Sequence, residues 1–350
     1  MFAYVGGYTT PDRDGRGNGI NVYRVDEASG EWSHLHHVGG LVNPSLFTLN
    51  RERNRLYSVH GGRTLMSAFE IGRDTGALRL INQVDCQGNN PVDSALDPTE
   101  RFLVIANYGT GAVAVMPVGE GGRLQGVSQL IALQGTPGPD AKEQPSSHPH
   151  AVSFDPTGQF VIVPDKGFDR TFFFRFQDGR LTPTEQGFIV SAPGAAPRHT
   201  TFHPALPVLY VNNELDSTVS VFDWTGGRAT ERQVIATVAA GYAGRNTTAE
   251  IAASPCGRYL YVSNRGQDSI VQFVIAPDSG LLTYAASFPT GGAKPRFFTL
   301  GPGGRHLYVA NQDSDEITVF DIDKAAGGLK PTGVRVRVGS PSAISFVTPS

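Results

Sequence analysis

A β-sheet unit of about 40–55 residues recurs along the chain, and this repetition restricts the possible fold more than any other feature of the sequence. The copy at 249–294 is the clearest. Its first apolar run ends at Pro255, a turn containing Gly257 follows, and the strand-like runs Tyr259–Asn264 and Ser269–Ile275 come next. Four runs rich in Val, Ile, Phe, Tyr and Thr, separated by turn-forming residues, predict a four-stranded antiparallel meander in each copy.

A seventh copy is divided between the two ends of the chain. Residues 341–350 contain only a first strand, whereas residues 1–42 contain only later strands. Because shared strands close a ring of sheets and leave no open edge, we expect the N- and C-terminal strands to complete one blade. The sequence therefore predicts an all-β single domain over residues 1–350, a seven-bladed β-propeller with four-stranded antiparallel blades. The expected blades are 341–350 with 1–42, 43–90, 91–147, 148–196, 197–248, 249–294 and 295–340.

An all-β sandwich and an open β-solenoid are built from similar short strands. Neither fold explains why the first strand that is missing at the N-terminus reappears at the C-terminus. The closed propeller is therefore the preferred interpretation.

Composition and charge exclude several functions. The net charge is −3 and no long basic run occurs, so we expect no nucleic-acid partner. No apolar stretch approaches 18 residues, so we expect no membrane partner. The opening residues lack a basic segment followed by an apolar one, which predicts a cytoplasmic protein without a signal peptide. Cys86 and Cys256 are expected to be reduced thiols.

The propeller topology brings distant residues to one rim. The first strand of each blade runs away from one face of the disc and the second strand returns to it. Residues just before a first strand and just after a second strand therefore meet at the same mouth. Those positions hold a mixed set of imidazoles, cations and carboxylates: His148, His150, Lys166, Arg198, His199, Glu214, Glu250, Arg265 and Arg296.

This set of side chains indicates a site for a small anionic substrate. Guanidinium groups bind phosphate or carboxylate in bidentate fashion, and Lys166 adds a further cation. Glu214, Glu250 or His148 is the candidate general base on water, and an Arg or a His is the candidate group that stabilises an oxyanion. Such chemistry suits hydrolysis of an ester or lactone, and also proton transfer next to a carboxylate, as in a cyclase. The chain has no Gly-x-Ser-x-Gly or His-Glu-x-x-His motif.

The rim motifs resemble those of the seven-bladed lactonase family. This family contains bacterial 6-phosphogluconolactonases of the cycloisomerase-2 type and fungal carboxy-cis,cis-muconate lactonising enzymes. The resemblance covers essentially the whole chain. It is carried by Tyr4–Thr9, Ser147–His150, Pro197–Pro204, Tyr210–Glu214, Ala249–Ile251, Ser263–Gly266, Pro295–Phe297 and Ala310–Gln312.

The resemblance implies a metal-independent site without a cofactor. The family positions proposed as catalytic match His148, Arg198, Glu214 and Arg265 in this chain. The phosphogluconolactonase branch implies hydrolysis of 6-phosphogluconolactone in the pentose phosphate pathway, whereas the muconate branch implies a lactonising cycloisomerase acting on a carboxymuconate-like diacid. The remaining rim residues, predicted to bind substrate, are His150, Lys166, His199, Glu250 and Arg296.

Several alternatives stay open at this level. His148 and His150 share one face of a strand, so a metal site with a third ligand from His199 or Glu214 is conceivable. Arg198 and Arg265 can instead form ion pairs between blades. The insert 134–147 is either a lid or a surface loop. A propeller can also be a binding module without catalysis, but the concentration of charge on one rim favours a small anionic ligand. Together with the family resemblance, this rim favours a sugar lactonase.

Overall fold

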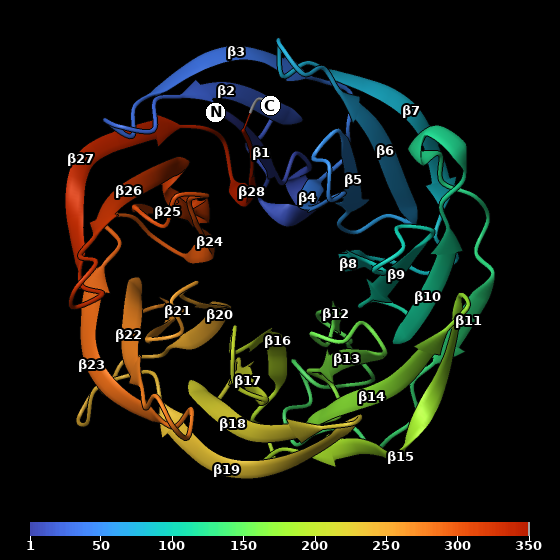
Figure 1. The fold of residues 1–350 in the computed structure, drawn as a ribbon, viewed down its shortest axis with the longest axis vertical. Coiled ribbons are helices and arrows are strands. Elements are labelled where there is room, and N and C mark those ends of the chain that lie inside the picture. Colours follow the sequence, from blue (N-terminus) through green and yellow to red (C-terminus); the bar gives the residue numbers. More distant parts are fainter. Residues whose placement is uncertain (349–350) are drawn as a thin grey trace.

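The computed structural model describes residues 1–348, and these form seven four-stranded antiparallel sheets arranged in a ring (Figure 1). We number the blades along the chain. Blade 1 has the order β28 (Pro341–Val347), β1 (Phe2–Gly7), β2 (Ile20–Val25) and β3 (Trp32–Val38). The predicted fold class, a seven-bladed propeller closed by strands from both ends of the chain, is confirmed.

The other six blades each use four strands that are consecutive in the chain. Blades 2 and 3 contain β4 (Pro44–Leu49), β5 (Arg55–His60), β6 (Leu65–Ile71), β7 (Leu78–Asp85), β8 (Pro91–Leu96), β9 (Phe102–Asn107), β10 (Ala112–Pro117) and β11 (Gln129–Ala132). Blades 4 and 5 contain β12 (Ser153–Phe154), β13 (Phe160–Asp165), β14 (Arg170–Gln177), β15 (Arg180–Val190), β16 (Pro197–Phe202), β17 (Val208–Asn213), β18 (Thr218–Thr225) and β19 (Arg228–Ala236). Blades 6 and 7 contain β20 (Thr247–Ala253), β21 (Tyr259–Arg265), β22 (Ser269–Ile275), β23 (Leu282–Pro289), β24 (Pro295–Leu300), β25 (His306–Asn311), β26 (Glu316–Ile322) and β27 (Leu329–Arg337).

Helical structure within residues 1–348 is confined to three single turns of 3₁₀ helix. These are η1 (Pro11–Arg13), η2 (Glu120–Gly122) and η3 (Gln312–Ser314). In this part of the chain, no helix is long and apolar enough to cross a membrane.

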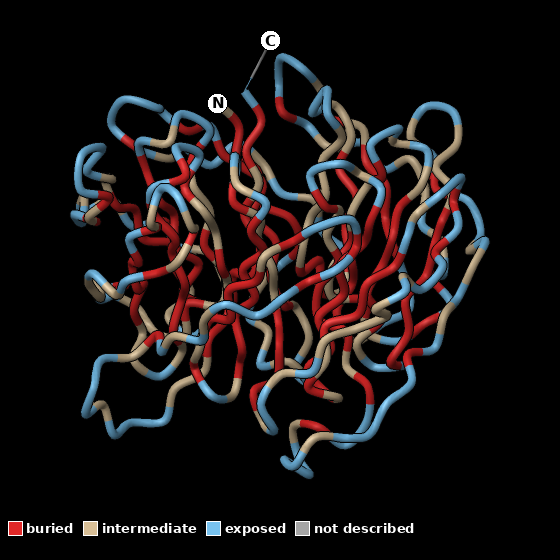
Figure 2. The backbone as a smooth tube through the Cα atoms, turned by 60° about the horizontal axis from the view of Figure 1, so that its bottom comes forward, coloured by how far each residue is buried: buried red, intermediate tan, exposed pale blue. Residues whose placement is uncertain are grey.

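The hydrophobic core is divided among the seven interfaces between neighbouring blades. One cluster of buried apolar side chains lies at each interface of the described chain. Between blades 7 and 1, for example, Ala3, Val5 and Phe346 pack against Tyr308 and Ile317. The buried residues run along the strands inside the disc, and the exposed residues lie on the connecting loops and outer strands (Figure 2). Blade-to-blade packing therefore fixes the positions of the strand ends that form the rims.

A hydrogen bond from a buried tyrosine to a glycine carbonyl recurs between neighbouring blades. The tyrosine lies on the second strand of one blade, and the glycine on the turn before the fourth strand of the next. The bonds are Tyr4 Oη to Gly76 O at 2.9 Å, Tyr210 Oη to Gly280 O at 2.8 Å and Tyr261 Oη to Gly327 O at 2.7 Å. The glycines have φ between +68° and +71°, a conformation that a side chain would strain. Tyr308 occupies the same position in blade 7, but its buried hydroxyl has no partner within residues 1–348.

The inner strands carry β-bulges at the end nearest one mouth of the ring. In β16 the register shifts between Pro197 and His199, and in β24 it shifts between Pro295 and Phe297. The residue between each pair is left out of the ladder, and a bulge of this kind re-aims its side chain. Comparable shifts in β4, β8, β20 and β28 leave Ser45, Val92, Ala249 with Glu250, and Ser342 outside the regular pairing, whereas the two-residue strand β12 has no such shift. The bulges thus present Arg198 and Arg296 at the mouth of the ring.

We predict that Tyr261→Phe lowers the free energy of unfolding by about 1–2 kcal/mol, because the buried carbonyl of Gly327 loses its hydrogen bond. Tyr308→Phe is the matched control. It removes a buried hydroxyl that has no partner in the described chain, so stability should stay equal or increase. Urea denaturation of both variants measures the difference, and equal losses would contradict the role assigned to the tyrosine–glycine bond.

Candidate active site

The predicted rim residues do gather at one mouth of the ring. A narrow cavity of about 20 Å³ lies on the ring axis and is lined by residues of all seven blades. It includes His150, Arg198, His199, Glu250 and Arg296. The other four predicted residues are linked to this group through Tyr108 and through ion pairs; they are His148, Lys166, Glu214 and Arg265. The structure therefore brings together the full set of site residues predicted from the sequence.

Glu214 is the centre of a buried cluster of cations from three blades. It follows β17 in a turn, and only 6% of its surface is exposed. Its Oε1 lies 2.8 Å from Lys166 Nζ and 3.3 Å from Arg265 Nη2, and its Oε2 lies 3.0 Å from Arg198 Nε. Burial alone would raise the pKa of Glu214, but Arg265, Lys166 and Arg198 hold it well below its usual value. Glu214 is therefore permanently ionised and a weak proton acceptor.

Lys166 lies between two carboxylates. It directly follows β13, and its Nζ donates to Glu214 Oε1 at 2.8 Å and to Glu143 Oε2 at 2.7 Å. Burial lowers the pKa of Lys166, but Glu214, Tyr108 and Glu143 more than offset this effect and raise it. The ammonium thus stays charged, and two anions share that charge.

The insert 134–147, which supplies Glu143, is anchored to blade 4. The buried Gln144 donates from Nε2 to the carbonyl of Lys166 at 2.8 Å and to Asp169 Oδ1 at 2.7 Å. The insert also packs so closely on Gly167 that a side chain there would collide with the carbonyl of Ser146. The insert is therefore anchored to blade 4 and contributes one carboxylate to the mouth. It combines features of the two expected forms, a lid and a surface loop.

His148 is oriented by its surroundings. Its ring stacks on Tyr108 with centroids 4.3 Å apart and planes inclined by 6°, and its Nδ1 lies 3.0 Å from the carbonyl oxygen of Tyr108. A carbonyl oxygen can only accept, so this contact places the proton on Nδ1. Nε2 is then left with a lone pair. The backbone N–H of His148 donates to Asp165 Oδ1 at 2.9 Å, which fixes the segment that carries the ring.

His150 is buried and uncharged. Its ring meets Tyr108 edge-on at 5.5 Å and lies 5.2 Å from the His199 ring. Burial, with the nearby Arg198, keeps the pKa of His150 well below its usual value. His148 and His150 contact the Tyr108 ring in different ways, one stacked and one edge-on. Within the described residues, no three His, Cys, Asp or Glu side chains are grouped as metal ligands.

A second polar group lies deeper along the axis. His199 Nδ1 lies 3.0 Å from Glu250 Oε1, and both residues also line an adjoining cavity of about 200 Å³ that contains Asp93. Burial raises the pKa of Asp93 to about 7, although its two oxygens accept backbone N–H groups of Ser94 and Val152. Burial also lowers the pKa of His199 against the opposing effect of Glu250.

Sequence reasoning missed four residues of this mouth. Tyr108 directly follows β9, just as Lys166 follows β13 and Glu214 follows β17. Its place on the rim could therefore have been predicted from the repeat. Asp93 lies next to the bulge in β8, in register with His199 beside the bulge in β16. Tyr8 packs under Arg296. Glu143 comes from the insert and has no counterpart in the repeat, so no pattern pointed to it.

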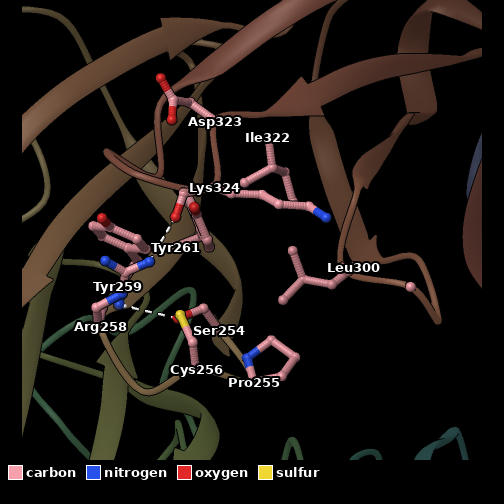
Figure 3. Close-up of a pocket in the computed structure, with 12 residues that line it drawn as sticks. Ser254, Pro255, Cys256, Arg258, Tyr259, Tyr261, Leu300, Ile322, Asp323 and Lys324 are labelled. Atoms are coloured by element: carbon pink, nitrogen blue, oxygen red, sulfur yellow. Dashed lines mark hydrogen bonds between the residues drawn. The ribbon is translucent and has the colours of Figure 1, made fainter.

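The opposite rim carries a different cavity. It has a volume of about 300 Å³ and lies among the turns between strands of blades 6 and 7 (Figure 3). Cys256, Arg258 and Tyr259 line one wall, and Leu300 with Lys324 lines the other. This cavity lies at the strand ends remote from Glu214.

Comparison with known proteins identifies the family. A family model described as lactonase, 7-bladed β-propeller, matches residues 2–346. The chain is 32% identical to the 6-phosphogluconolactonase of Bacillus subtilis (strain 168) over 299 residues, which cover 84% of this chain and 83% of that protein. It is 30% identical to the 6-phosphogluconolactonase of Serratia proteamaculans (strain 568) over 314 residues, covering 89% and 90% of the two chains.

A solved structure of similar shape supports the same conclusion. The periplasmic gluconolactonase of Pseudomonas aeruginosa superposes with a TM-score of 0.92 at 33% identity, and the match covers 100% of this chain and 99% of that one. These similarities confirm the class of lactone-hydrolysing enzymes predicted from the sequence, and the chain belongs to the seven-bladed β-propeller lactonase family.

Proposed function

We propose that this protein hydrolyses a sugar lactone, with 6-phosphogluconolactone as the substrate, and that His148 activates the attacking water. The observation that carries the proposal is the arrangement of the His148 ring, whose Nδ1 is held by the Tyr108 carbonyl while Nε2 is left to accept a proton. The relatives named 6-phosphogluconolactonase support this choice of substrate. The same activity places the protein in the pentose phosphate pathway.

The reaction needs one base and a stabiliser for one developing negative charge. In the proposed mechanism a water oxygen forms a bond to the lactone carbonyl carbon as His148 Nε2 takes its proton. The electron pair of the carbonyl moves onto its oxygen, and the cations around Glu214 stabilise that oxyanion. The bond from the carbonyl carbon to the ring oxygen then breaks. The electron pair on the oxyanion re-forms the carbonyl, and the proton taken up by His148 Nε2 passes to the ring oxygen, which becomes a hydroxyl. The carboxylic acid formed then loses its proton to water and becomes a carboxylate.

Glu214 serves as a counter-ion in this mechanism. Three cations buried together would repel one another and would be costly to desolvate without a carboxylate between them. Because Glu214 stays ionised, it is poorly suited to accept a proton from water. Glu250 Oε1 is already engaged, since it lies 3.0 Å from His199 Nδ1 and accepts the backbone N–H of Ile251 at 3.0 Å. Of the three candidate bases considered from the sequence, His148 therefore fits best.

We also propose a cytoplasmic location. Neither Cys86 nor Cys256 forms a disulfide, which suits a reducing compartment. The Pseudomonas neighbour is described as periplasmic, so the two proteins would differ in this respect. Fractionation of the native host with an antibody against this chain tests the location, and recovery with the periplasmic fraction would contradict it.

We predict that the wild-type protein speeds 6-phosphogluconolactone hydrolysis above the spontaneous rate, and that His148→Gln lowers kcat/KM by about 10²–10⁴-fold, because the general base is lost. Proton release, followed continuously against a blank without enzyme, measures both rates. His37→Gln, on the exposed outer strand β3, is the matched control and should retain full activity. A His148→Gln variant as fast as the wild type would exclude His148 as the base.

We predict that Glu214→Gln lowers the free energy of unfolding by about 3–5 kcal/mol at neutral pH, since it leaves three buried cations without their counter-ion. The pKa of Glu214 is depressed in the folded state, so its stabilising contribution is complete above the unfolded-state pKa and is lost only as the pH falls toward the folded value. The loss should therefore be constant between about pH 6 and 8. Urea denaturation measures it, with the exposed Glu231→Gln of the same blade as control; a loss no larger than that of the control would contradict the counter-ion role.

A further inference from the structure

We propose that Arg296 binds the phosphate of the substrate, and that Glu143 disfavours anions at the Lys166 side of the mouth, so that a phosphorylated lactone binds in one orientation. This inference rests on the proposed lactonase function and deepens it. It assigns the choice between phosphorylated and unphosphorylated lactones to two residues on opposite sides of the mouth.

The cations at the mouth are not equally compensated by carboxylates. Lys166 is shared by Glu143 and Glu214, and Glu214 also compensates Arg198 and Arg265. Three cations and two carboxylates leave this cluster with one positive charge, which matches the single charge that develops on a lactone oxyanion. The cluster therefore has no cation to spare for a phosphate dianion.

Among the rim residues predicted from the sequence, Arg296 is the cation that remains uncompensated. Within residues 1–348 its guanidinium has no carboxylate within 4.0 Å and no hydrogen-bond acceptor, and it lies 5.3 Å from the centroid of the Tyr8 ring. The bulge in β24 presents it to the axial cavity, where it is only half-buried. A guanidinium has five N–H donors in a fixed planar fork, which suits a phosphate with several acceptor oxygens. The packing on Tyr8 holds the fork in place before any ligand arrives.

Glu143 holds its position through the local structure of the insert. Asp140 Oδ1 accepts the backbone N–H groups of Lys142 and Glu143, both at 3.0 Å, and the neighbouring Gln144 is fully buried. The Glu143 side chain is 27% exposed, so it binds Lys166 from the solvent side of the mouth. An anion that approaches Lys166 therefore meets a carboxylate already bound there, and like charges in a partly desolvated site repel strongly.

The two sides of the mouth are joined by Tyr108. Burial raises the pKa of the Tyr108 phenol. The nearby charges act in both directions, since Glu214 and Glu143 raise this pKa and Lys166 and Arg296 lower it. Since the His148 ring stacks on the same side chain, the reacting carbonyl belongs beside Tyr108. The phosphate of 6-phosphogluconolactone is attached at the end of the sugar remote from the carbonyl carbon. An orientation with the carbonyl at His148 and the phosphate at Arg296 satisfies both groups.

The test compares kcat/KM for 6-phosphogluconolactone with kcat/KM for glucono-δ-lactone in each variant. We expect Arg296→Gln to lower this ratio by about 10–100-fold, mainly through a higher KM for the phosphorylated lactone. Arg296→Lys should recover part of the ratio, because it restores the charge without the fork. Glu143→Gln should raise the ratio by about 3–10-fold, because the mouth then carries one negative charge less and repels the phosphate dianion less strongly.

The controls use the same substitutions elsewhere in the chain. Arg305→Gln removes an exposed arginine from the opposite rim of blade 7, and Glu120→Gln removes an exposed carboxylate from blade 3; neither should change the ratio. A ratio within twofold of the wild type in Arg296→Gln or in Glu143→Gln overturns the assignment of that residue. An equal change of the ratio in the matched control variant also overturns that assignment.

Calorimetric binding of 6-phosphogluconate and gluconate separates this inference from the proposed function. If the wild-type protein hydrolyses neither lactone, the proposed function fails, and binding then decides the inference. Weaker binding of 6-phosphogluconate to Arg296→Gln, with a smaller change for gluconate, supports the phosphate site. Equal loss for both ligands, or no loss for either, overturns it.

Discussion

The mouth of this propeller depends on one buried carboxylate. Glu214 joins Lys166 of blade 4, Arg198 of its own blade and Arg265 of blade 6. These cations come from three consecutive blades, so the cluster forms only when blades 4, 5 and 6 have their final spacing. A buried carboxylate with three cationic neighbours stays ionised, and in turn it allows three cations to remain charged away from water. The same ion pairs thus determine both the geometry and the electrostatics of the site.

The backbone explains why these side chains face the axis at all. In a regular strand, side chains alternate between the two faces of the sheet, and those faces are occupied here by the packing between blades. Bulges near the start of six of the seven inner strands release one or two residues from this alternation, and at β16 and β24 the released residue is an arginine. The repeat therefore supplies the same local irregularity many times, and the identity of the released residue decides what the mouth can bind.

The sequence was sufficient to predict the fold and the membership of the rim. The repeat, with its missing strand recovered at the C-terminus, required a closed ring, and strand register then placed Arg198, Glu214 and Arg265 together. The protonation of these groups was beyond prediction, because it depends on burial and on distances between side chains of different blades. This is why Glu214, Glu250 and His148 were all candidate bases from the sequence. Glu143 escaped notice for a different reason, since it lies in an insert that breaks the repeat.

The insert is therefore a reasonable place to look for differences in substrate among relatives of this fold. Proteins named for a phosphorylated lactone and for gluconolactone resemble this chain to a similar degree, so overall similarity does not separate the two substrates. A phosphate adds charge at one end of the sugar and leaves the lactone carbonyl unchanged. Discrimination then has to come from charges at the edge of the reacting cluster or beyond it. In this chain Glu143 lies at the solvent side of the cluster, and Arg296 lies outside it. A family that keeps the Glu214 cluster and varies these two positions can change its substrate without altering the chemistry of ring opening.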